Sequence, residues 1–273
     1  MIYKVGDVLG KLEGCIIHKK PFSHIRFGDG GIKFIDSILN GNFEQMRIII
    51  DKEGLPATNV VEIFELWGYY ARRADFIDSP EVYFNDTFWH RIKKKGKPIN
   101  EATKIKMLKW KDLYHNSEFD NDNYCNPESN YLMTIRLPGN KKNILDIMKG
   151  RRIALITAKP HVKANLKDYN VDIIEIVAHY QNQYKNSYHQ VMDIIANEAC
   201  NYDFWLVAAG ELGRIYTGAI KENGGRAVDI GYIIEFWHNE NLHPRLTSFL
   251  KRSVNNNLEL VLTEEGKKYE KYI

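Results

Sequence analysis

The stretch DFWLVAAGELGRIYTGAIKENGGRAVDIGY, residues 203–232, contains two short apolar runs on either side of a helix-like segment. Each run has the length of a strand and ends at a glycine, Gly210 after the first and Gly231 after the second. Between the runs, the segment from Gly213 has the composition of a helix and stops at the glycine pair 224–225, which is typical of a helix end. The stretch therefore predicts strand, helix, strand.

The residues before this stretch continue the same pattern. Two more apolar runs, Ile153–Thr157 and residues 171–177, precede a segment with helical spacing over residues 187–200. Strands that are apolar throughout and alternate with helices are typical of a parallel sheet covered on both faces. The sequence thus predicts an α/β fold with a Rossmann-like, mostly parallel sheet in residues 151–273. No clear linker marks a boundary near residue 150, so one continuous domain is the alternative.

Residues 1–150 are predicted to be the more helical half. A short strand, His24–Phe27, runs into the glycine-rich turn Gly28-Asp29-Gly30-Gly31, and a helix is expected after it. This order of elements presents backbone N–H groups and a helix N-terminus to an anion. Helical spacing is found in four segments of this half: Tyr3–Gly14, Ile32–Leu39, Val60–Ala71 and Ala102–Tyr114.

Composition argues against several classes of protein. Charged residues appear too early for a signal peptide, and no apolar run approaches the roughly 20 residues that span a bilayer. The three cysteines are far apart without CxxC spacing, which is typical of reduced, packed thiols. The nine histidines show no HxxxH or HExxH arrangement, which argues against a zinc site. We therefore expect a cytoplasmic protein without a membrane span.

Charge is unevenly distributed although the net charge is only +3. Between Arg91 and Lys111 there are nine Lys or Arg residues against one acid, Glu101. Such a run is usually a solvated helix face. The alternative is a basic surface that attracts a phosphorylated donor or an anionic polymer.

In parallel sheets, ligands bind beyond the carboxyl ends of the strands. Three segments are predicted to lie at that edge: Thr157–Lys159, Gly210–Gly213 and Asp229–Tyr232. The second lacks a GxGxxG pattern, which argues against a nicotinamide dehydrogenase. Its Glu211 is either a helix-stabilising acid or a catalytic carboxylate. Asp229 lies in an apolar strand, where a carboxylate needs a partner, either a bound sugar or a structural cation.

Two motifs together resemble a known family. The first has the form S-x-x-R-F-G-D-G and comprises Ser23 and Arg26–Gly30; the second has the form G-x-x-A-x-D-I-G over residues 224–231, preceded by Gly210. This combination resembles the GT-D-type glycosyltransferases, bacterial enzymes first recorded as a domain of unknown function. The resemblance implies a Rossmann-like fold, a nucleotide-sugar donor that is usually UDP-linked, and an Asp-x-Glu motif for metal or donor binding. Here the Glu of that motif is Gly31, so Asp29 stands alone as a ligand for Mn²⁺ or Mg²⁺ and metal dependence stays open.

The resemblance and the strand ends together assign expected roles. Asp29 and Glu211 are the candidate catalytic carboxylates, as general base or donor ligand. The expected donor-binding residues are Arg26, Gly28, Gly30, Gly210, Gly213, Arg214, Asp229, Gly231 and Lys159. The expected acceptor-binding residues are Asn126, Glu128, Arg136 and Tyr232.

The acceptor is the least constrained part of this hypothesis. The resemblance favours a glycan. The basic stretch leaves open a DNA acceptor, as for bacteriophage enzymes that glycosylate hydroxylated bases and must reach a base edge. A further alternative is a non-catalytic module that only binds a nucleotide or nucleic acid.

Overall fold

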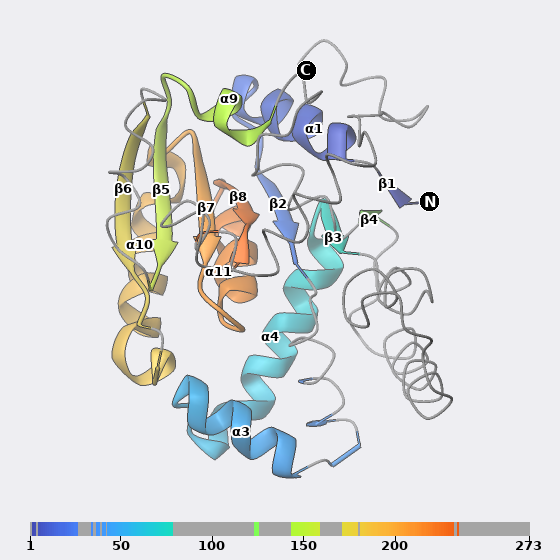
Figure 1. Cartoon of the computed structure of the whole chain (residues 1–273), viewed down its shortest axis with the longest axis vertical. Helices are drawn as coiled ribbons and strands as arrows, with labels where there is room; N and C mark the ends of the chain where they lie inside the picture. Colours follow the sequence, from blue (N-terminus) through green and yellow to red (C-terminus); the bar gives the residue numbers. More distant parts are fainter. Residues whose placement is uncertain are drawn as a thin grey trace, which may run out of the picture.

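A computed structural model of the chain forms one parallel sheet with helices on both faces (Figure 1). It describes residues 2–3, 5–26, 34, 37–38, 40–41, 43–78, 123–125, 143–158, 171–179, 181–231 and 234.

The sheet has eight strands in the order β1-β4-β3-β2-β8-β7-β5-β6. Every pair of neighbouring strands is parallel, as the sequence predicts. The strands are β1 (Ile2–Tyr3), β2 (Phe22–Ile25), β3 (Phe76–Asp78), β4 (Tyr124–Cys125), β5 (Arg152–Thr157), β6 (Asp172–Val177), β7 (Phe204–Ala208) and β8 (Arg226–Asp229).

The sheet extends beyond the C-terminal half in which the sequence places it. Its central junction pairs β2 with β8, with Phe22 opposite Arg226 and His24 opposite Val228. Four of the eight strands come from residues 1–150, so the N-terminal half is both helical and part of the sheet. The sheet is therefore continuous across the two halves.

Two apolar clusters form the core, one on each face of the sheet. Alternate residues of β5 divide between them: Ala154 and Ile156 belong to one cluster, Ile153 and Leu155 to the other. Because successive strand residues point to opposite faces, a strand that is apolar throughout fills both clusters at once.

The helices are divided between these two faces. Helices α3 (Phe43–Glu53), α4 (Val60–Arg73), α10 (His189–Glu198) and α11 (Gly213–Glu222) supply residues to the cluster of Ala154. Helices α1 (Val5–Ile17) and α9 (Ile144–Met148) supply residues to the cluster of Ile153 and lie near each other in Figure 1. We call these the α11 face and the α1 face.

Several elements differ from their expected bounds. The helix expected over residues 187–200 is α10 with a π-helical turn before it, η3 (Tyr184–Tyr188), and a 3-10 turn after it, η4 (Ala199–Asn201). Tyr184 and Tyr188 stack at 4.8 Å between ring centroids along the π turn. A further 3-10 turn, η1 (Ala57–Asn59), precedes α4.

Other expected helices are described only in part. Helix α1 begins two residues later than expected and continues to Ile17. Of the helix expected over residues 32–39, Phe34, Ser37 and Ile38 are described and are helical. The helix expected over Ala102–Tyr114 lies outside the described residues. Within the described part of the chain, no helix is both long and apolar enough to cross a bilayer.

Candidate functional site

The carboxyl ends of β2 and β8 bring the two sequence motifs together. β2 ends at Ile25 and β8 at Asp229, so Arg26 and Ile230 follow neighbouring parallel strands. Nη1 of Arg26 donates to the carbonyl oxygen of Ile230 at 3.4 Å, although the two residues are 204 positions apart in the sequence. The two motifs thus meet at the centre of the sheet.

Arg214, in the first turn of α11, ties the same region together. Its Nε donates to the carbonyl oxygen of Arg26 at 2.8 Å. Its Nη1 donates to the carbonyl oxygen of Gly210 at 3.2 Å and to Oε2 of Glu211 at 2.6 Å. The guanidinium lies 5.0 Å from the centre of the Trp67 ring. Arg214 is only 6% exposed, so this buried cation holds the end of β2 against the turn after β7.

The turn after β7 depends on Gly210. This residue has φ of +57°, in the left-handed region that favours glycine. A Cβ added there would lie 3.5 Å from Oε1 of Glu53, 3.9 Å from Oε1 of Gln183 and 4.0 Å from Nζ of Lys52. The turn therefore faces the end of α3 and the residue before η3, neither of which the sequence assigned to the site.

Glu53 is the most deeply buried carboxylate at this turn. It is 1% exposed, and its Oε1 lies 3.2 Å from Nζ of Lys52. Its Oε2 has no hydrogen-bond partner among the described residues. Burial raises the pKa of Glu53, and the nearby Glu211 raises it further, while Lys52 and Arg214 oppose the shift. The site therefore contains a carboxyl group that holds its proton to higher pH than an exposed glutamate.

This raised pKa makes a prediction for stability. Because the unfolded chain releases the proton near the usual pKa of 4.5, the folded state loses stability as the pH rises from there through the raised pKa. Glu53→Gln removes this titration, so its melting temperature relative to wild type is expected to increase between about pH 4 and pH 8. The increase is about 2–4 °C for each kcal/mol of relief. Thermal unfolding across this range measures it, with Glu44→Gln on the same helix as the control. Parallel curves for Glu53→Gln and wild type would contradict the prediction.

Asp229 is buried at the end of β8, 4% exposed. Burial raises the pKa of Asp229, and the positive charges of Arg26 and Arg214 oppose that shift. Two arginines thus place positive charge near this carboxylate. Sugar recognition by Asp229 stays a prediction.

Gly231 allows Arg26 to lie across the end of β8. It has φ of +50°, and a Cβ at this position would overlap the Arg26 guanidinium. A glycine is needed here both for the backbone conformation and for the close approach of the side chain.

The structure places the expected site residues unequally. It brings together Arg26, Gly210, Glu211, Gly213, Arg214, Asp229 and Gly231. The expected residues Gly28, Asp29, Gly30, Asn126, Glu128, Arg136, Lys159 and Tyr232 lie outside the described residues, so Asp29 as a metal ligand stays a prediction.

For two residues the structure changes the expected contact. The Gly213 N–H donates to the carbonyl oxygen of Ala209 at 3.0 Å, so it is already used within the protein. A Cβ at Gly213 would lie 3.3 Å from Cγ1 of Val207, so this glycine serves close packing. Glu211 is held by Arg214 rather than projecting freely from the turn.

A separate hollow of about 320 Å³ lies at the opposite edge of the sheet. Its lining includes Asn201–Asp203 before β7, and Gly224 and Arg226 at the start of β8. These residues are at the amino ends of the strands, away from the cluster around Arg214. The hollow is therefore not part of the candidate site.

Comparisons with known proteins support the fold. No protein-family model and no curated protein matches the sequence. A solved structure of the domain of unknown function 1792, described as having a distinct glycosyltransferase fold, matches with a TM-score of 0.54 at 15% identity, over 97% of this chain and 95% of the other. A structure described as a new glycosyltransferase (DUF1792) from Streptococcus sanguinis matches with a TM-score of 0.57 at 14% identity, over 96% of both chains. The chain therefore has the fold of the domain of unknown function 1792, as the resemblance of its two motifs implies.

Proposed function

We propose that this protein transfers a sugar from a nucleotide-diphosphate sugar to an acceptor hydroxyl. The observation that carries the proposal is the cluster in which Arg26, Arg214 and Asp229 meet the Gly210 turn at the carboxyl edge of the sheet. Ligands of parallel α/β proteins bind at this edge. The likeness to structures described as glycosyltransferases supports the same class of reaction.

The donor's diphosphate fits the positive end of this cluster. The turn after β7 leads into the N-terminus of α11, where the helix dipole favours an anion. Arg26 is partly exposed and can reach a phosphate, whereas Arg214 is buried and holds the turn in shape. Cations fixed at this position stabilise the negative charge that develops on a departing nucleoside diphosphate.

A carboxylate is one of the usual general bases for deprotonating an acceptor hydroxyl. Asp29 and Glu211 are the candidates from sequence, and the structure adds Glu53 beside the Gly210 turn. A carboxyl group with a raised pKa is better matched to proton transfer near neutral pH than an ordinary one. Since Glu211 is engaged by Arg214, we assign it a positioning role and assign the base to Glu53 or Asp29.

The proposal keeps the finer assignments that the sequence suggests. The donor is UDP-linked, Asp29 is the candidate ligand for Mn²⁺ or Mg²⁺, and the acceptor is a glycan. A DNA acceptor remains the alternative because of the basic run of residues 91–111, which lies outside the described residues. The protein is expected to act in the cytoplasm.

A donor screen tests this proposal. UDP-, GDP-, dTDP- and CMP-sugars are added to the full chain with and without Mn²⁺, and the melting temperature and the release of free nucleotide are measured. One donor is expected to stabilise the protein and to release its nucleotide slowly. Arg26→Ala is expected to abolish both effects, because it removes the partly exposed cation of the cluster.

Arg47→Ala is the control for Arg26→Ala. Arg47→Ala removes an exposed arginine on α3 that pairs only with Asp51 among the described residues, so it is expected to respond as wild type does. No response to any donor, together with salt-dependent DNA binding, would favour the nucleic-acid-binding alternative, because phosphate contacts release counterions.

A further inference from the structure

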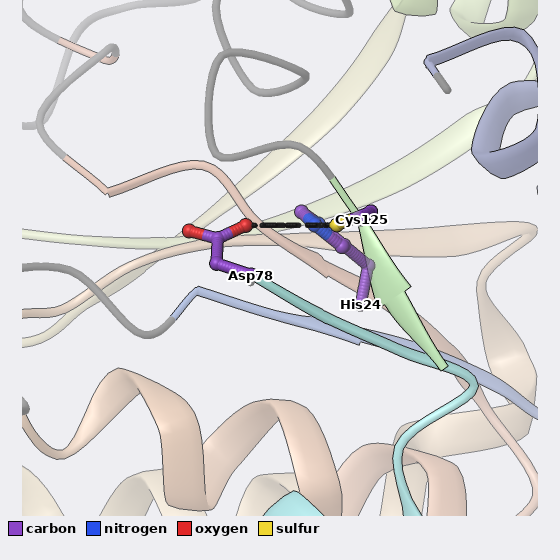
Figure 2. A group of neighbouring side chains, drawn as sticks. All are labelled: His24, Asp78 and Cys125. Carbon is purple, nitrogen blue, oxygen red and sulfur yellow. Dashed lines mark hydrogen bonds and ion pairs between the residues drawn. The ribbon is translucent and has the colours of Figure 1, made fainter. Parts of the chain in front are cut away.

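Three fully buried side chains from three neighbouring strands converge on one point. His24 lies on β2, Asp78 ends β3 and Cys125 ends β4, and Figure 2 shows the three side chains turned toward one another. Each side chain has no exposed surface. Nε2 of His24 lies 3.2 Å from Sγ of Cys125 and 3.4 Å from Oδ1 of Asp78, and Sγ and Oδ1 are 3.7 Å apart.

The strand register explains why these residues meet. Asp78 is directly opposite Cys125 in the pairing of β3 with β4. Phe22 and Phe76 belong to the cluster on the α1 face, and residues two positions further along each strand point to the same face. His24 and Asp78 are those residues. The three side chains therefore share the α1 face, at the carboxyl end of the sheet.

Their arrangement differs from that of a nucleophilic triad. In a triad, the acid and the nucleophile contact opposite nitrogens of the imidazole ring. Here the carboxylate and the thiol both face Nε2 of His24, so the imidazole does not lie between them. Three donor atoms that converge on one point are instead typical of a metal site.

The three distances match those of a tetrahedral zinc site. With Zn–S near 2.3 Å and Zn–N and Zn–O near 2.0–2.2 Å, tetrahedral angles separate S from N or O by about 3.5 Å, and N from O by about 3.4 Å. The observed separations of 3.2, 3.7 and 3.4 Å lie within about 0.3 Å of these values. Small side-chain adjustments would therefore suffice to bind the ion.

The hydrogen bond between the Cys125 thiol and Asp78 is weak. The contact from the Cys125 thiol to Asp78 is long at 3.7 Å, and a thiol is a weak donor. Burial, followed by the charge of Asp78, raises the pKa of the Cys125 thiol, so without a metal this sulfur keeps its proton. An ion held by Nε2, Sγ and Oδ1 would replace this long thiol contact with short coordination bonds.

We propose that His24, Asp78 and Cys125 supply three of the ligands of a zinc ion. Binding replaces the thiol proton: the S–H bond breaks, an S–Zn bond forms, and the proton leaves to solvent. Thiolate and imidazole ligands favour Zn²⁺ over the harder Mg²⁺ and Mn²⁺. The ion expected here thus differs from the Mn²⁺ or Mg²⁺ proposed at Asp29.

The spacing of histidines in the sequence does not reveal such a site. His24 and Cys125 are 101 positions apart, and Asp78 and Cys125 are 47 apart, so no local motif connects them. The ion would join β2, β3 and β4, and β2 also carries Arg26 at its end. A stabilised β2 would in turn support the position of Arg26.

Metal content and cobalt spectroscopy of the full chain test the proposal. After exposure to zinc and removal of excess, elemental analysis is expected to find a single bound zinc ion, whose removal by chelator lowers the melting temperature. With Co²⁺ in place of zinc, the protein is expected to show a thiolate-to-cobalt charge-transfer band and the visible bands of tetrahedral cobalt.

Matched cysteine variants locate the ligand. Cys125→Ser is expected to lose the charge-transfer band, whereas Cys200→Ser, which removes an exposed thiol, is expected to keep it. Asp78→Asn preserves the shape of the side chain and is expected to weaken zinc binding. The cobalt spectrum of the wild-type protein tests the proposal even if one of the variants fails to fold. The proposal is overturned if the wild-type protein binds neither ion, or if it binds cobalt without a charge-transfer band. It is also overturned if Cys200→Ser loses the band and Cys125→Ser keeps it.

Discussion

Replacing Arg214 by methionine is expected to abolish donor binding and to lower the free energy of unfolding by about 3 kcal/mol. The guanidinium is almost fully buried, and its loss leaves the Glu211 carboxylate and the carbonyl oxygens of Arg26 and Gly210 without their donor. Methionine fills much of the volume beside Trp67, so the expected effect reports lost hydrogen bonds more than a cavity. Denaturant unfolding and the donor thermal shift measure the two consequences.

A lysine at the same position separates charge from geometry. Arg214→Lys keeps the positive charge, but a single ammonium group does not reproduce the planar fork that reaches Arg26, Gly210 and Glu211 together. We expect it to recover part of the stability and little of the donor response. If Arg214→Met is as stable as wild type and responds normally to the donor, Arg214 does not have the role assigned here.

Gly218→Ala is expected to destabilise the protein strongly, because it forces two packed helices apart. Gly218 lies in the middle of α11, and a Cβ there would overlap Cβ and Cγ of Tyr70 on α4. Alanine improves helix propensity by about 1 kcal/mol, but overpacking costs about 1–3 kcal/mol or more. Because Cβ of Tyr70 is fixed to its backbone, the two helices must move apart, and we expect a net loss of about 2 kcal/mol.

Gly213→Ala is the control on the same helix. A Cβ at Gly213 meets Cγ1 of Val207 at 3.3 Å, which a small adjustment accommodates. Thermal unfolding is expected to show a fall of several degrees for Gly218→Ala and a much smaller change for Gly213→Ala. Tyr70→Ala is expected not to rescue Gly218→Ala, since the overlapping Cβ remains. Equal melting temperatures for the two alanine variants would show that α4 and α11 are less closely packed than the structure has them.

The sequence predicts the elements around residues 203–231 well because a glycine follows each of them. β7, α11 and β8 begin and end within one residue of their expected bounds. Gly210 lies just after β7, the glycine pair 224–225 just after α11 and Gly231 just after β8. β3 and β4 have three and two residues, too few for any periodicity to appear. The pairing of β2 with β8 joins residues about 200 positions apart, and no local pattern encodes it.

The residues of the candidate site also divide into those that the sequence predicts and those that it does not. Arg26, Gly210 and Asp229 were predicted because each closes or follows a recognisable strand. Glu53 reaches the Gly210 turn from the end of α3, a helix with polar and apolar residues mixed around it, so only the folded arrangement shows its place. Asp78 also closes a buried strand, but that strand has only three residues and no apolar run marks it in the sequence.

The pairing of β2 with β8 also sets the time at which the sheet can be completed during synthesis. One hydrogen-bonded neighbour of β2 is β3, which emerges from the ribosome early. Its other neighbour, β8, follows about 200 residues after β2. Until then the inner edge of β2 has unpaired backbone groups, and such edges pair with other chains. Sheets built on such distant pairings also fold slowly. The nascent chain therefore spends most of its translation with an open β2 edge, in the state that holding chaperones bind.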